Sequence, residues 1–338
     1  YNGSSGVDRL YCSLETQAMG QGAPTYFRSI GTAASYQDVG TITVTPGSAT
    51  VTGSGTTWKT ANRGRGDRLT VGANSYVIAR VDSNTELTLT APAVAGATTG
   101  TYTIARQFTT LQAWEDCISF TTPCTYFPVT SADLVADNRS EIGIAYEDST
   151  FTWASAGTAI LTIDGTTTDP SHMITLTADG SNRHYGVPGG GVTLDNSGNN
   201  PTAAVLVLDD HVTLEWLEVL APTAPSIGID VGGQLASDNL VRLRWLIVHD
   251  TFGRGINLQW PGLSAVVSNN FVYDTGGDAV HHDPTPGLQP GRYVQLFNNT
   301  VRNAGLNGFG TALAAGFFCL GAQAVVVAHH QRLVLRPQ

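Results

Sequence analysis

A segment of eight residues recurs in the second half of the chain and constrains its fold more than any other feature. Its copies begin at Val212, Val241, Ala265 and Val294, so that successive copies are separated by 29, 24 and 29 residues. A period in the twenties, with short strands between turns rich in Asn and Gly, is typical of a β-solenoid. Because one coil cannot bury its inner face alone, we expect the first residues of these copies to stack into one continuous core.

Several polar side chains recur at the same position of successive copies. Asp250, Asp274 and Asn303 share one position, and the Asn-Asn pairs at 269–270 and 298–299 share another. Asn and Asp side chains stabilise turns by hydrogen bonding to nearby backbone groups. We therefore interpret both sets as ladders of turn residues, not as catalytic groups.

Two further sets could carry chemistry. Trp216 and Trp245 are aligned, and we interpret them as packing residues, with a platform for sugar rings as the alternative. The Asp-Asp-His segment at 209–211 invites an acid–base interpretation, because paired carboxylates can divide the work of proton transfer. Its carboxylates align with residues 238–239 (Asp-Asn) one coil later, which favours a recurring turn.

Ahead of the repeat, the chain alternates apolar and polar residues with a period of two in six short segments: 41–45, 49–52, 67–71, 75–79, 86–90 and 101–104. Gly, Pro, Asn and Asp separate them, which is typical of antiparallel strands joined by tight turns. Three apolar segments between this region and the repeat predict earlier coils of the solenoid: 159–163, 173–177 and 191–195.

Residues 109–118 predict the one helix of the chain. Thr109 and Gln112 have the spacing of a capping box, and Leu111, Trp114 and Ile118 fall on one face. We expect this amphipathic helix to cover the open end of the solenoid, where strand edges would otherwise be exposed.

These patterns divide the chain into four parts. We expect an irregular segment over residues 1–36, an antiparallel β module over 37–105, a parallel β-helix with its capping helix over 106–310, and a C-terminal cap or apolar tail over 311–338.

Both β regions resemble known families. The module resembles small β domains of phage tail proteins and bacterial surface proteins, through residues 47–58, 66–68 and 81–89. The repeat resembles the right-handed parallel β-helix superfamily, which includes pectate-lyase-like enzymes, polygalacturonases and phage tailspikes. The first resemblance implies an attachment or spacer module. The second implies an all-β, right-handed parallel β-helix.

Composition narrows the function. Asp and Glu number 27 against 17 Lys and Arg, a net charge of −10 that argues against nucleic-acid binding. No glycine-rich phosphate loop precedes a helix, and the cysteines lack ligand spacing, so we expect neither a cofactor nor a metal. Cys117 and Cys124 bracket a short loop and either form a disulfide or stay as separate buried thiols.

The strands that open the coils bring together residues that break the repeat. Apolar residues at three aligned positions should point into the core: Ile229, Ile256 and Val280. Their next neighbours should then point outward, stacked one above another: Asp230, Asn257 and His281. Four more residues border this face: Arg254, Gln259, Trp260 and Asp283.

A groove on this face could hold a sugar chain. In an enzyme, Asp283, His281 and Asp230 would be the catalytic residues, acting as base or acid. The substrate-binding residues would be Asn257, Gln259, Arg254 and Trp260, with Arg254 countering substrate charge. The competing interpretation is that these are solvated side chains on one face of a solenoid.

No motif of a catalytic β-helix family is present: we find neither Asn-Thr-Asp with a later Gly-His-Gly nor an Arg/Lys cluster near a calcium-binding Asp group. We therefore expect an extracellular, cell-surface or virion-surface structural protein that recognises a glycan or a partner surface. The alternative is a polysaccharide lyase or glycoside hydrolase. A third interpretation is assembly, as a homo-oligomer or end to end.

The uncharged segment 311–328 departs from the repeat. Its length just suffices for a membrane span, and contact with a membrane is expected only in that case. Gln323 and the lack of a long Leu/Ile block favour buried terminal strands or a cap.

Overall fold

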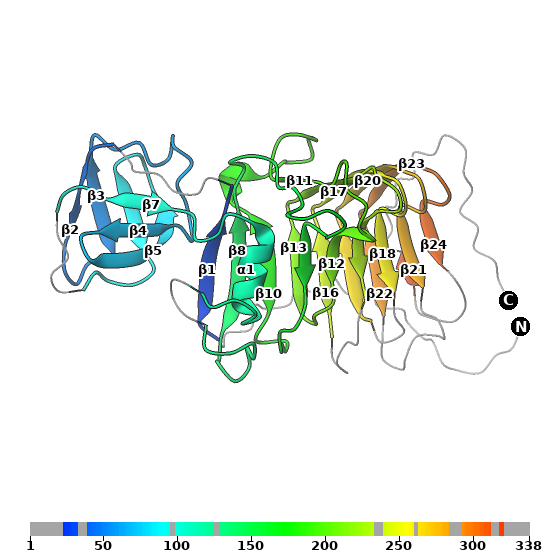
Figure 1. Ribbon diagram of the computed structural model, residues 1–338, viewed down its shortest axis with the longest axis horizontal. Helices are drawn as coiled ribbons and strands as arrows, with labels where there is room; N and C mark the ends of the chain where they lie inside the picture. Colours follow the sequence, from blue (N-terminus) through cyan, green and yellow to red (C-terminus); the bar gives the residue numbers. More distant parts are fainter. Residues whose placement is uncertain are drawn as a thin grey trace, which may run out of the picture.

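A computed structural model of the chain shows an all-β protein in two parts (Figure 1). The residues that it describes are 23–32, 39–94, 99–124, 129–232, 239–259, 263–283, 293–311 and 318–320. A small antiparallel domain lies at one end of the molecule, and a parallel β-helix extends from it. The predicted fold class, a parallel β-helix with an N-terminal antiparallel module, is confirmed.

Three parallel sheets run along the β-helix. The first contains, in spatial order, β1 (Thr25–Ile30), β8 (Ser140–Ala145), β10 (Ile174–Ala178), β13 (Val212–Glu215), β16 (Val241–Arg244), β19 (Ala265–Ser268), β22 (Val294–Phe297) and β25 (Phe318–Leu320). The second contains β11 (Thr193–Asp195), β14 (Glu218–Ala221), β17 (Ile247–Thr251), β20 (Phe271–Thr275) and β23 (Thr300–Ala304). The third contains β24 (Phe309–Thr311), β21 (Val280–Asp283), β18 (Ile256–Gln259), β15 (Ile227–Val231), β12 (Ala203–Val207) and β9 (Leu161–Ile163).

The small domain is a six-stranded antiparallel sheet whose strands form at the six predicted segments. In spatial order they are β2 (Thr41–Val44), β3 (Thr50–Ser54), β6 (Glu86–Leu89), β5 (Asn74–Val81), β4 (Arg68–Val71) and β7 (Thr103–Ala105). The domain has its own core, in which the indole of Trp58 donates to the hydroxyl of Tyr102 at 2.8 Å.

The register of the first sheet follows the sequence repeat. Val241 pairs with Ala265, which pairs with Val294, and these residues are buried with Val212 in one continuous core. The predicted stacking of aligned residues is therefore confirmed. It holds because each inward side chain meets the equivalent residue of the next coil.

The aligned turn residues adopt left-handed backbone conformations. Asp250, Asp274 and Asn303 have φ values of 47°, 51° and 51°. The amide of Asn303 donates to Asp274 at 2.6 Å, so these side chains bond to one another as well as shaping the turn. At the other position, the buried Asn270 and Asn299 form a true ladder, with the amide of Asn270 donating to Asn299 at 2.9 Å.

The β-helix begins earlier than predicted. Residues 1–36 were expected to be irregular, but β1 pairs in parallel with β8 as the first strand of the first sheet. The sequence of β1 lacks the alternation of apolar and polar residues that predicts a strand, because β1 contributes a charged residue to a buried position. Arg28 forms a bidentate ion pair with Glu141 of β8, at 2.8 and 3.1 Å, and neither residue is more than 1% exposed. The antiparallel domain is thus inserted after the first strand of the β-helix.

The predicted helix is α1 (Leu111–Ile118), and its apolar face is buried in the core of the β-helix. The N-cap is Thr110, whose hydroxyl accepts from the amide of Ala113, and not Thr109 as the capping-box spacing suggested. Gln112 instead reaches the outer strand β9: its amide oxygen accepts from the backbone N–H of Thr162 at 2.8 Å. Its amide nitrogen donates to the carbonyl of Thr162 at 3.3 Å, so that one side chain takes the place of a neighbouring strand.

Cys117 and Cys124 form a disulfide, with their Cα atoms 5.0 Å apart. It links the end of α1 to the loop that follows, which decides between the two interpretations of the sequence.

The C-terminal region is described in part. β25 pairs in parallel with β22 and adds a strand to the first sheet. Most of the apolar segment 311–328 lies outside the described residues, as do Trp260 and the loop 284–292. In the described part of the chain, no helix is long and apolar enough to cross a membrane.

Candidate functional site

Aromatic side chains gather where the first sheet turns into the second. The indoles of Trp216 and Trp245 stack with centroids 5.1 Å apart and planes 15° apart. Tyr185, which is 69% exposed, lies 5.9 Å from Trp216. On the outer face of the second sheet, Phe271 and Tyr273 stack at 4.5 Å. We call these five residues the aromatic flank.

Guanidinium groups cover the two indoles. Arg183 lies over the Trp216 ring at 4.7 Å, and Arg244 lies over the Trp245 ring at 4.7 Å. Arg244 also pairs with Glu215 at 2.7 Å, which fixes its position. Arginine stacks on aromatic faces while its N–H groups remain available at the edge. The flank therefore combines flat apolar surfaces with hydrogen-bond donors.

The loop that carries Tyr185 is held in place by its neighbours. The ring of His184 contacts the backbone carbonyl of Trp245 through Nε2 at 2.9 Å, and its Nδ1 accepts from the amide of Gly186 at 2.9 Å. Burial lowers the pKa of His184 below its ordinary value, which favours the neutral ring that these two contacts require. Further along, the amide of Gly189 donates to Glu218 at 2.6 Å.

Glu218 begins a charged cluster beside the aromatic flank. Nε2 of His249 lies 2.8 Å from Glu218, and Nδ1 lies 2.8 Å from Asp250. Burial favours the neutral form of each group, but the hydrogen bonds between them outweigh it. The pKa of Glu218 is consequently lowered and the pKa of His249 is raised. The imidazole ring of His249 stacks on Tyr273, with centroids 4.7 Å apart and planes 2° apart.

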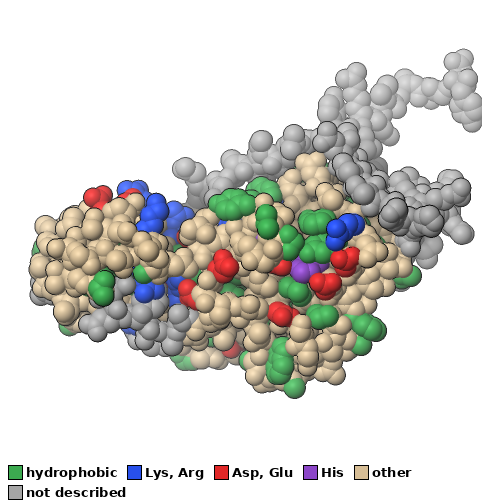
Figure 2. Space-filling model, turned by 90° about the horizontal axis from the view of Figure 1, so that it is seen from above, with side chains coloured by type: hydrophobic (Ala, Val, Ile, Leu, Met, Phe, Trp, Pro, Cys, Tyr) green, Lys and Arg blue, Asp and Glu red, His purple; other side chains and the backbone are tan. Residues whose placement is uncertain are grey.

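Seen from above the view of Figure 1, the β-helix carries acidic and hydrophobic side chains around a histidine, with a basic side chain beside them (Figure 2). The second sheet supplies this mixture, since Arg302 of β23 lies over the Tyr273 ring at 4.9 Å. Burial and the nearby carboxylates raise the pKa of Tyr273, so its hydroxyl stays protonated and can donate a hydrogen bond.

This arrangement suits binding better than proton transfer. Both ring nitrogens of His249 are occupied by carboxylates, which leaves no lone pair to accept a proton from a substrate. The described residues also contain no group of three His, Cys, Asp or Glu that could hold a metal ion. Planar aromatic surfaces bordered by a few fixed polar groups are the usual make-up of a ligand-binding surface.

The structure brings together part of the predicted site on the third sheet. Asp230 pairs with Asn257, and Asn257 pairs with His281, as the register of the repeat implies. All three side chains are buried, with residue exposures of 4%, 0% and 7%. Asp230 accepts hydrogen bonds from Asn257 at 2.8 Å and from Gln259 at 2.8 and 3.0 Å.

The other predicted residues make different contacts. Arg254 donates to the side chain of Asn257 at 2.8 Å. Nδ1 of His281 lies 2.6 Å from Asp278, a residue that the sequence analysis did not select. Asp283 pairs in register with Gln259 at the end of β21 and is half-buried. Trp260 lies outside the described residues. The catalytic and substrate-binding roles of this set remain predictions.

Most of the charged cluster on the second sheet was not predicted from the sequence. One signal was present: His249, Tyr273 and Arg302 occupy the same position of the repeat, and the register stacks them in that order. The contacts of Tyr185 and Glu218 had no such signal, because the loop 183–191 interrupts the repeat and reaches residues that are distant in sequence.

No protein family matches the sequence, and no curated protein matches it. A solved structure with weak similarity is the Gp54 tailspike of the Acinetobacter baumannii bacteriophage AP22, in complex with A. baumannii capsular saccharide. The identity is 10% and the TM-score is 0.18, over 86% of this chain and 51% of the tailspike chain. This chain thus spans about half the length of that tailspike, and a TM-score this low carries no functional argument.

Proposed function

We propose that this chain is a glycan-binding β-helix protein of a cell or virion surface, and that the aromatic flank binds the sugar chain. The observation that carries the proposal is the backbone of the two stacked tryptophans. Trp216 and Trp245 have φ values of 61° and 53°, where the next two coils place Asn269 and Asn298 at 58° and 54°. Asn tolerates this left-handed conformation, whereas a bulky side chain there is unusual and strained.

Strain of this kind is kept where it serves a function. Two coils of the same solenoid use asparagine at this turn, so the fold itself does not require an indole. The two indoles lie parallel and half-buried at the surface, and Tyr185 extends them. The faces of the two rings are covered by each other and by the two guanidinium groups, so a pyranose ring would pack its C–H bonds along the exposed edge of the stack.

Polar groups around the flank would bind the sugar hydroxyls. The carboxylate of Asp250 accepts hydrogen bonds, and the guanidinium of Arg302 donates them. Asp250 and Arg302 both lie at the surface, with side chains 54% and 55% exposed. The β-helix supports these groups on strands, so their positions are set before a ligand arrives.

Binding to a panel of neutral and acidic oligosaccharides tests this function. The variant Trp216→Ala/Trp245→Ala should lose about tenfold or more in affinity, because each aromatic contact contributes about 0.5–1.5 kcal/mol. Phe120→Ala is the matched control: Phe120 is 49% exposed, follows α1 and has a positive φ of 59°, as the two indoles do. Equal affinity of the double variant and the wild type would contradict the proposal.

The enzyme interpretation has one observation in its favour. Nδ1 of His281 is oriented by Asp278, while Nε2 is buried and has no hydrogen-bond partner among the described residues. Such a dyad resembles a positioned base. New reducing ends or ultraviolet absorbance from unsaturated uronate, measured on the same panel, would indicate a hydrolase or a lyase. Products that vanish in His281→Ala would locate the reaction on the third sheet.

A further inference from the structure

A cavity lies where the antiparallel domain meets the first coils of the β-helix. Its volume is about 330 Å³. The domain contributes the segment 59–65 and the end of β5, and the β-helix contributes β10 and the residues that follow it, including Arg183. In Figure 2, Lys and Arg side chains gather at this boundary between the two parts of the molecule.

Positive charge dominates the lining. Five cationic side chains face the cavity with one carboxylate, Asp179, in a chain whose net charge is −10: Lys59, Arg63, Arg65, Arg80 and Arg183. Lys59 is the one lysine of the whole chain. Gathering like charges is unfavourable unless an anion offsets them.

Asp179 alone offsets one of these five charges. It accepts from the backbone and hydroxyl of Ser181, at 3.1 and 2.7 Å, and the hydroxyl oxygen of Tyr146 lies 3.3 Å from it. Arg80 pairs with Asp82 at 2.5 Å, whereas within the described ranges no carboxylate forms an ion pair with Lys59, Arg65 or Arg183 in the salt bridges observed. Arg65 and Arg183 instead use Nε to donate to the backbone carbonyls of the strand ends beside them.

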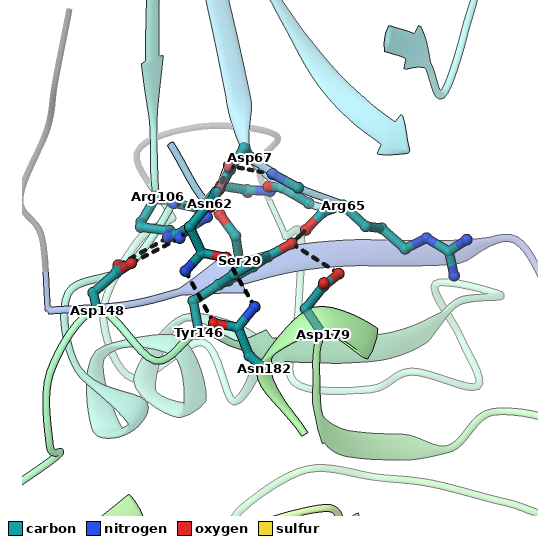
Figure 3. Close-up of polar contacts among 12 residues, drawn as sticks. Ser29, Asn62, Arg65, Asp67, Arg106, Tyr146, Asp148, Asp179 and Asn182 are labelled. Carbon is teal, nitrogen blue, oxygen red and sulfur yellow. Dashed lines mark hydrogen bonds and ion pairs between the residues drawn. The ribbon is translucent and has the colours of Figure 1, made fainter. Parts of the chain in front are cut away.

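The two walls of the cavity are fixed to each other (Figure 3). Arg106, the first residue after β7, donates to Asp67 of the domain at 2.8 and 2.9 Å and to Asp148 of the β-helix at 2.8 and 2.9 Å. Its guanidinium also lies 3.5 Å from the centroid of the Tyr146 ring.

The segment that carries Arg63 and Arg65 is bonded to the β-helix on both sides of Gly64. The side chains of Asn62 and Asn182 exchange two hydrogen bonds of 2.9 Å. The hydroxyl of Tyr146 donates to the carbonyl of Arg65 at 2.8 Å. A Cβ on Gly64 would clash with Tyr146, so the close approach requires glycine here. The cationic groups are therefore presented from a rigid junction, which lowers the entropy lost on binding.

From this geometry we infer that the junction cavity binds the anionic groups of an acidic glycan. This inference rests on the proposed function and names the class of glycan. Arg183 connects the two sites, because it lines the cavity and also covers the ring of Trp216. A sugar packed along the exposed edge of the indole stack can thus place a neighbouring carboxylate in the cavity, where guanidinium groups bind it through charge-assisted hydrogen bonds.

The test compares an oligogalacturonate with its neutral methyl ester by isothermal titration calorimetry. The cavity variant is Lys59→Gln/Arg65→Gln, since both side chains are exposed and neither supports the core. Arg242→Glu on the first sheet lowers the net charge by the same two units and is the control for that change. We expect the wild type to prefer the acidic ligand about tenfold, a preference that salt weakens and the cavity variant abolishes.

The outcomes separate this inference from the proposed function. If the cavity variant keeps the acidic preference, or if both ligands bind the wild type equally, the inference is overturned while binding at the flank can still stand. Trp216→Ala/Trp245→Ala could leave the affinities for both ligands unchanged while the cavity variant abolishes the preference for the acidic one. That result would contradict binding at the aromatic flank and support the anion site. The assignment of an acidic glycan to the cavity would also be overturned if a thymidine oligonucleotide bound as tightly as the oligogalacturonate, or if no acidic glycan bound.

Discussion

At the scale of single residues, the left-handed turn between the first and second sheets separates structural from functional positions. Four successive coils place Trp216, Trp245, Asn269 and Asn298 there, all with positive φ. The sequence repeat predicts their alignment and indicates packing residues, and Trp216 does pack against the core of the β-helix. The backbone conformation could not be predicted from the repeat, and it is the conformation that makes an indole unfavourable at this turn.

Trp245→Asn tests this distinction. Asparagine relieves the left-handed strain, worth roughly 1 kcal/mol, while the stack with Trp216 is lost. We expect the free energy of unfolding, measured by urea denaturation, to change by less than about 1 kcal/mol. Glycan affinity should nevertheless fall. If Trp245 were chiefly a packing residue, the substitution would instead cost about 3 kcal/mol or more.

At the scale of elements, α1 closes the end of the β-helix through polar as well as apolar contacts. The apolar face was predictable from its periodicity, because burial follows the helical repeat. The contacts of Gln112 and Glu115 were not, since they depend on the strand β9, which lies some fifty residues further along. Glu115 accepts from the backbone N–H of Asp164 at 3.2 Å. Burial raises its pKa to about 8, and the charge of Asp209 adds to this.

Glu115 therefore predicts a pH dependence of stability. The folded state binds a proton that the unfolded state releases above its ordinary pKa of 4.5. This contribution is fully present below pH 4.5 and is lost as the pH rises through about 8. Glu115→Gln keeps the acceptor without the charge, so it should be more stable than the wild type at pH 9 by up to about 5 kcal/mol.

Urea denaturation of both proteins at pH 5 and pH 9 checks the prediction. Asp209, whose pKa burial raises to about 6, is present and charged in both proteins at pH 9, so the difference at that pH includes its repulsion of Glu115. A difference in unfolding free energy that stays the same at both pH values would contradict the account.

At the scale of the whole molecule, the antiparallel domain is inserted between β1 and the rest of the β-helix. The repeat predicted the β-helix, and the period-two alternation predicted the antiparallel domain, because both patterns are local periodicities of the sequence. They missed β1, where the buried ion pair of Arg28 and Glu141 replaces apolar packing. They also missed the junction, since the cavity is formed by loops of two domains with no common periodicity.

The most direct test of the central claim, that a glycan binds on the aromatic flank, is to follow the indole N–H resonances by NMR during titration with an oligogalacturonate. The account predicts that the resonances of Trp216 and Trp245 shift in a saturable way. Those of Trp58 and Trp114, which are 0% exposed in the two cores, should stay in place. Saturable binding that leaves Trp216 and Trp245 unshifted would contradict the account.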